Sequence, residues 1–75
     1  MRTGDTAVTT RAVWFYDEQN PDAGALRGRA VLLCSGILVQ VVRVGSTTGR
    51  FLVKSREGRL AWMDEKDLEM PLLAA

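Results

Sequence analysis

The sequence contains no histidine and a single cysteine, Cys34. One cysteine excludes a disulfide within the chain, so the fold cannot depend on an internal covalent cross-link. The absence of histidine removes the commonest zinc ligand and the commonest general base. Cys34 has no histidine to activate it and ends an apolar run, which predicts a buried, inert thiol. We therefore expect neither an enzyme nor a protein with a metal ion or cofactor.

Long apolar runs and an excess of one charge are also missing. No segment approaches the roughly 18 apolar residues that span a bilayer, and residues 1–10 lack the apolar segment of a secretory signal. These two absences predict a cytoplasmic protein with no membrane contact. Ten basic and nine acidic residues give a net charge of +1, so no overall attraction to nucleic acid is expected, although local patches stay open.

Length and composition indicate one small globular domain. The chain has 75 residues, of which 47% are hydrophobic and 25% charged, an ordinary composition for a folded protein. We expect a flexible N-terminus over residues 1–5, the folded domain over 6–70 and a C-terminal tail over 71–75.

Residues typical of strands follow one another through most of the chain. Residues 6–16 are rich in β-branched and aromatic side chains with period-two patterning, which predicts a first strand, kinked near Arg11. Residues 17–28 contain Asp, Asn, Pro and Gly and predict a long loop. The other expected strands cover residues 29–34, 37–44, 50–55 and 59–63.

Tight turns and a short terminal element complete the expected order. Residues 45–49 and 56–58 predict hairpin turns, the second with Gly58 at positive φ. Residues 64–70 are too few for a stable helix and predict one 3-10 turn before a last short strand. Five to six short antiparallel strands without an amphipathic helix indicate an all-β protein, a small barrel. Residues 37–44 are apolar on both faces, so this strand is expected inside a sheet or, as an alternative, across a homodimer interface.

Two stretches resemble the SH3-like barrel family. Residues 12–17, AVWFYD, are similar to the ALYDY opening of peptide-binding SH3 domains, and residues 49–69, GRFLVKSREGRLAWMDEKDLE, are similar to the closing stretch of SH3 and bacterial SH3 domains. The resemblance implies an SH3-like barrel with a long first loop, two hairpins, a 3-10 turn and a short closing strand. The family's groove for proline-rich peptides is incomplete, because Arg50 or Phe51 replaces its exposed tryptophan and Asp67 replaces its tyrosine. The resemblance thus implies the fold and not the ligand.

A cluster of aromatic residues precedes the expected long loop. Trp14 and Tyr16 share one face of the strand and Phe15 the other, so the cluster either caps the core or forms a docking surface. In SH3-like barrels this loop and the 3-10 region flank one groove, so their acidic residues are expected to form an acidic surface there. The residues expected to bind a protein partner are Trp14, Tyr16, Asp17, Glu18, Asp22, Asp64 and Asp67.

The expected function is a non-enzymatic protein-binding module, a small bacterial or phage accessory or regulatory protein that docks on a larger assembly. The alternative is a nucleic-acid-binding module, as in SH3-like transcription and translation factors, which would use Arg43, Arg50, Lys54, Arg56 and Arg59. The final residues, LLAA, resemble the ending that bacterial ATP-dependent proteases recognise on tagged proteins, and a chance match explains them equally well.

Overall fold

The computed structural model describes residues 1–19 and 26–71 of the chain. The secondary structure consists of β1 (Thr6–Thr9), β2 (Val13–Gln19), β3 (Leu26–Leu33), β4 (Leu38–Val44), β5 (Arg50–Ser55), β6 (Leu60–Asp64), a 3-10 turn (Glu65–Asp67) and β7 (Leu68–Glu69). The strands form one antiparallel sheet in the order β3-β2-β6-β5-β4-β1-β7. The predicted all-β class is confirmed, with seven strands in place of the five to six expected.

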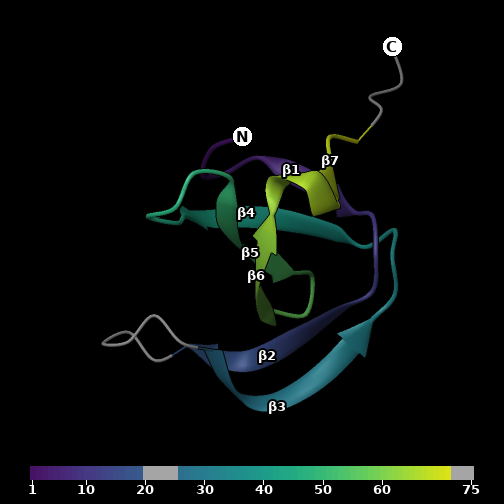
Figure 1. The fold of residues 1–75 in the computed structure, drawn as a ribbon. Helices are drawn as coiled ribbons and strands as arrows, with labels where there is room; N and C mark the ends of the chain where they lie inside the picture. Colours follow the sequence, from purple (N-terminus) through teal and green to yellow (C-terminus); the bar gives the residue numbers. More distant parts are fainter. Residues whose placement is uncertain (20–25, 72–75) are drawn as a thin grey trace.

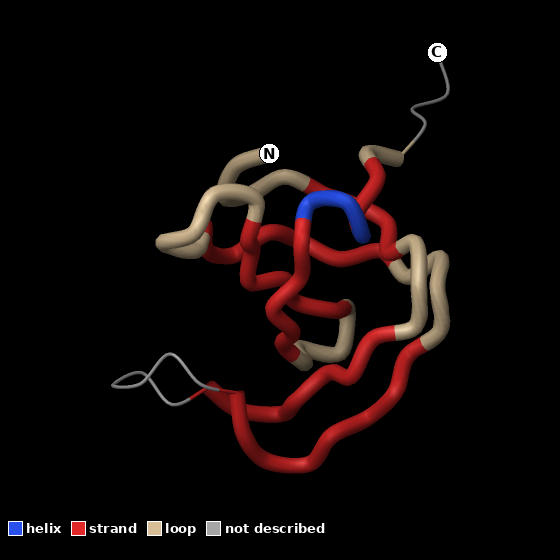
Figure 2. Tube along the Cα trace, viewed as in Figure 1, coloured by secondary structure: helices blue, strands red, loops and turns tan. Residues whose placement is uncertain are grey.

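The sheet is curved and open. In Figure 1 the β2–β3 hairpin forms a curved ribbon on one side of the molecule, β1, β4 and β7 lie on the opposite side, and β5 and β6 run between them. Figure 2 shows loops at the corners where the chain passes from one side to the other. Within the described residues, β3 pairs only with β2 and β7 pairs only with β1, so the two ends of the sheet are not joined by a strand ladder.

The core is built from side chains that alternate along the central strands. Phe15, Val41, Val53 and Met63 are fully buried and come from β2, β4, β5 and β6 respectively. β5 lies in the middle of the sheet and is buried on both faces, because Leu52 is covered as well as its neighbours on either side. Phe51 and Val53 point inward, as alternation along the strand expected over residues 50–55 predicts, and Leu52, which alternation places on the other face, is buried as well.

The expected first strand is in fact two strands. β1 pairs with β4 and β7, whereas β2 pairs with β3 and β6, so the chain crosses from one part of the sheet to another over residues 10–12. The backbone N–H of Thr10 donates to the carbonyl of Asp67 at 2.9 Å, which fixes this corner against the 3-10 turn. The position of the kink near Arg11 was therefore predicted correctly, but a single continuous strand over residues 6–16 was wrong.

Both ends of the expected long loop are strands. Residues 17–19 continue β2 and residues 26–28 begin β3, while residues 20–25 lie outside the described part of the chain. The ladder is shifted between Tyr16 and Glu18, where Asp17 faces two residues of β3. One of these is Gly28, whose φ of +93° is the left-handed conformation that a bulge with glycine requires.

The second half of the chain follows the prediction closely. β5 covers residues 50–55, the turn before β6 has Gly58 at a φ of +90°, and a 3-10 turn precedes the short β7. β4 is hydrogen-bonded to β1 through residues 38–40 and to β5 through residues 39–44, which confirms an internal strand. The homodimer through residues 37–44 stays a prediction. No helix in the described residues is long and apolar enough to cross a membrane.

Cys34 differs from its expectation, and residues near the N-terminus are hydrogen-bonded to β4. Cys34 is exposed, so the expectation of a buried thiol was wrong; β3 ends at Leu33, one residue before it, and the apolar run does not continue inward. The expected flexible N-terminus contacts β4, since the N–H of Gly4 donates to Val41 O at 2.7 Å and the N–H of Val41 donates to Asp5 O at 2.8 Å.

Candidate functional site

The outward face of the β2–β3 hairpin carries the most exposed aromatic residue of the described chain. Trp14 lies opposite Leu32 in the ladder and Tyr16 lies opposite Ala30. Side chains of directly opposed residues project to the same face of a sheet, so these four lie together. Trp14 is 54% exposed and Leu32 is 51% exposed, whereas Phe15 between the two aromatic residues is 0% exposed. The predicted alternation is confirmed, and its outward side is an apolar surface.

This outward face continues across the sheet as one row of side chains. Tyr16 pairs with Leu60, Leu60 with Lys54, and Lys54 with Gln40. Gln40 in turn pairs with Thr6 at the far side. The row is apolar at the hairpin and becomes polar and cationic over β5 and β4. A ligand that covers Trp14 and Leu32 and extends along this row would therefore cross Tyr16 and Leu60 before it reaches the positive side chain of Lys54.

Charged residues also border the apolar surface of the hairpin, and they form ion pairs with one another. Arg27 Nε lies 3.5 Å from Glu18 Oε2, across the ladder. Arg59 Nε lies 3.3 Å from Asp17 Oδ1 and also forms an ion pair with Glu57. Asp17 and Glu18 are exposed but already have cationic partners, so they do not create an uncompensated acidic surface.

The predicted acidic residues of the 3-10 region lie elsewhere. Asp64 ends β6, and its carboxylate accepts a hydrogen bond from Arg50 Nη1 at 3.0 Å. Asp17 pairs with Arg59, which lies five residues before Asp64 along β6 and so about 16 Å from it at roughly 3.3 Å per residue. The structure thus does not bring the two acidic segments to one surface. Asp22, the remaining predicted acid, lies outside the described residues.

Asp67 is directed inward and holds the corner of the chain. It is 8% exposed, and its Oδ2 lies 3.0 Å from Arg11 Nε. The contact is an ion pair without the alignment of a hydrogen bond. Because its carboxylate is covered and paired, Asp67 has a structural position and does not belong to an open docking surface.

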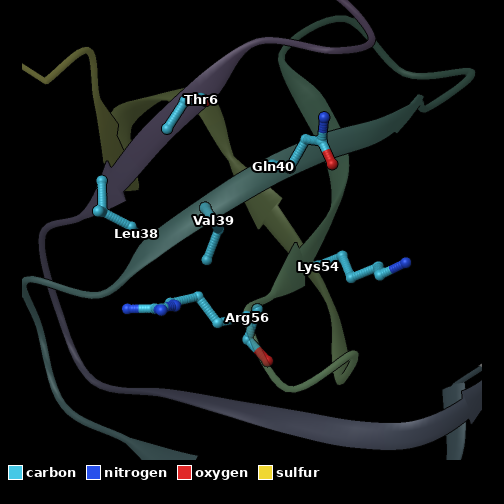
Figure 3. Close-up of a pocket in the computed structure, with 7 residues that line it drawn as sticks. Thr6, Leu38, Val39, Gln40, Lys54 and Arg56 are labelled. Atoms are coloured by element: carbon cyan, nitrogen blue, oxygen red, sulfur yellow. The ribbon is translucent and has the colours of Figure 1, made fainter.

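The five predicted basic residues do not form one uncompensated patch. Arg50 and Arg59 are ion-paired with acids of the same chain, whereas the described residues form no ion pair with Arg43, Lys54 or Arg56. A shallow hollow of about 330 Å³ lies over β1, β4 and β5 (Figure 3). Its lining is Thr6, Leu38, Val39, Gln40, Lys54, Ser55 and Arg56.

Figure 3 shows how the two cations of this hollow are arranged. The side chain of Lys54 points to one side and that of Arg56 points to the other. Two charges that diverge cannot both contact one phosphate group, because a phosphate contact requires donors that converge on its oxygens. Either residue alone can contact one anionic group, a carboxylate or a phosphate, so the hollow does not favour one of these anions over the other.

Sequence reasoning missed Leu32, the partner of Trp14. The residue lies in an apolar run that was expected as a strand, and nothing local in that run marks one of its leucines as exposed. The missing signal was the register of the hairpin, which places Leu32 opposite Trp14 and Val31 opposite the buried Phe15. Once the register is known, the alternation identifies the exposed member.

The described residues contain no group of three or more His, Cys, Asp or Glu side chains that could hold a metal ion. Comparison with protein-family models, characterised proteins and solved structures gives no match to this chain. The outward face of the β2–β3 hairpin, with the exposed pair Trp14 and Leu32, is therefore the structural feature that points to a function.

Proposed function

We propose that this chain is a non-enzymatic protein-binding module, which docks on a larger partner through the outward face of the β2–β3 hairpin. The observation that carries the proposal is the pair Trp14 and Leu32, which lie side by side and are each about half exposed at 54% and 51%. Tryptophan is among the residues that most often anchor protein interfaces, because a partner can bury much apolar surface on a rigid side chain.

The free energy gained by covering the exposed part of Trp14 supports its role as an anchor of the interface. A tryptophan side chain buries up to about 250 Å² when covered, so the exposed 54% of Trp14 corresponds to roughly 135 Å². At about 25 cal/mol per Å² of apolar surface, covering it contributes roughly 3 kcal/mol before the costs of association. Leu32 and the half-buried Tyr16 extend this surface, whereas the ion pairs at its border contribute little.

We also propose that the fold is SH3-like. Support comes from the strand order β7-β1-β4-β5-β6, from the hairpins that join β4, β5 and β6 in sequence, and from the 3-10 turn before the closing β7. In this interpretation the β2–β3 hairpin takes the place of the family's long first loop. The groove for proline-rich peptides is not part of the proposal, since Asp67 replaces its tyrosine and is ion-paired with Arg11.

Affinity capture from a bacterial lysate tests the proposed function. The wild-type chain, immobilised through a tag, should enrich one or a few proteins, and Trp14→Ala or Tyr16→Ala should lose them. Val44→Ser is the matched control, because Val44 is 49% exposed and apolar but lies on β4, outside the hairpin surface. Equal enrichment by the Trp14 variant, or equal loss by the Val44 variant, would contradict the proposal.

A further inference from the structure

The outer edge of β3 is the longest strand edge that the described residues leave unpaired. β3 has eight residues and forms a ladder only with β2. In an antiparallel pair, only every second residue directs its N–H and C=O groups to the neighbour, so the other residues of β3 direct theirs to the open edge. β7, at the other end of the sheet, has two residues and offers almost no edge.

The two halves of β3 differ in their chemistry. The first half contains Arg27, Arg29 and the bulge at Gly28. Charged side chains and bulges commonly prevent a strand edge from pairing with another chain. The second half, residues 30–33, is Ala-Val-Leu-Leu and carries neither a charge nor a bulge. An extended segment can therefore pair with residues 30–33, and the charged half limits how far that pairing extends.

The side chains beside this open half match an extended ligand. A strand added next to β3 would place every second side chain on the outward face, against Leu32 and close to Trp14. It would place its end beside Arg29, which is exposed and forms no ion pair with any described residue. Apolar residues at alternate positions followed by a carboxylate thus complement this edge in both shape and charge.

A second copy of the chain complements the edge less well. The sequence of β3, LRGRAVLL, contains two arginines and no acid. Antiparallel pairing of residues 30–33 with the same residues of a second copy would place each Arg29 opposite Cys34, so no carboxylate would face either guanidinium group. A segment of another protein that carries acids supplies the charge that a second copy lacks.

We infer that the partner binds by strand addition: an extended segment with alternating apolar residues and a flanking acid pairs with residues 30–33 of β3 and packs on Leu32 and Trp14. This inference rests on the proposed function, for which it names the mode of binding and the chemistry of the partner. It differs from the proposed function in requiring backbone hydrogen bonds at the edge of β3, which a partner that only covers the Trp14 face would not form.

A random library of linear 12-residue peptides, displayed against the full chain, tests the inference. We expect enrichment of acidic sequences with apolar residues at alternate positions. A synthetic peptide of the enriched sequence should slow amide hydrogen exchange at alternate residues within 30–33. Arg29→Glu should weaken its binding about tenfold, since one charge is reversed. Arg43→Glu, the control at an exposed and unpaired arginine on β4, should change affinity less than twofold.

Several outcomes would overturn strand addition. These are enrichment of no peptide, enrichment of proline-rich peptides, unchanged affinity in Arg29→Glu, or unchanged exchange at residues 30–33. Protection of residues 30–33 that rises with protein concentration in the absence of peptide would assign the edge to a second copy instead. If the Trp14-dependent capture succeeds while these tests fail, the proposed function stands and only the mode of binding is wrong.

Discussion

Replacement of two adjacent aromatic residues by alanine should have very different effects on stability. Phe15 is 0% exposed and belongs to the core, so Phe15→Ala should cost about 3–5 kcal/mol, the usual range for deletion of a buried aromatic side chain. The free energy of unfolding of native domains is about 0.05–0.15 kcal/mol per residue, which for 75 residues gives a total of roughly 4–11 kcal/mol. Phe15→Ala is therefore expected to remove a large part of the folding free energy.

Trp14→Ala should cost less than half as much. With 54% of the residue exposed, about 115 Å² of its surface is covered, which sets an upper bound of roughly 3 kcal/mol. The true cost should be about 1–2 kcal/mol, because the unfolded chain also buries apolar surface and no closed cavity remains after truncation.

Urea unfolding followed by far-ultraviolet circular dichroism measures both variants, because the backbone signal of the sheet remains in each. The midpoint should fall steeply for Phe15→Ala and modestly for Trp14→Ala, with similar m-values. Equal losses, or a larger loss for Trp14→Ala, would refute the reasoning, since they would place Trp14 in the core and Phe15 outside it.

Three other changes test separate parts of the structure. Gly28→Ala should lower stability by about 1–2 kcal/mol in thermal unfolding, because its φ of +93° is strained for any residue with a side chain; an unchanged Tm would contradict the bulge. Arg11→Ala should cost about 1–3 kcal/mol, since it leaves the covered Asp67 carboxylate without a cation. A double-mutant cycle with Asp67→Asn should show coupling, and additive losses would argue against the pair. Cys34 should react with a thiol reagent at the same rate in the native protein as in urea. A reaction that occurs only after unfolding would show that the thiol is buried.

Local patterns predicted the second half of the fold well. The strand over residues 50–55, the turn at Gly58 and the 3-10 turn before the last strand all depend on neighbours in sequence, which alternation and glycine placement report. The alternation of Trp14, Phe15 and Tyr16 was predictable for the same reason, but the sequence left open which of the two faces is outward, and the exposure of Trp14 settles it.

Features that depend on distant contacts were not predictable. The break between β1 and β2 contains neither glycine nor proline, and its cause is Asp67, more than fifty residues away, which binds Arg11 through its side chain and Thr10 through its carbonyl. The same contact removes Asp67 from the acidic surface that was expected. The exposure of Leu32 depends on hairpin register, which strand patterns alone do not specify.

Site-specific photo-crosslinking tests the central claim, that the outward face of the β2–β3 hairpin binds a protein, most directly. A photo-reactive residue in place of Leu32, 51% exposed, is compared with the same residue in place of Val44, 49% exposed, in cells that express the chain. Irradiation should give a discrete adduct with another protein from position 32 and none from position 44. No adduct from position 32, or the same adduct from both positions, would contradict the account.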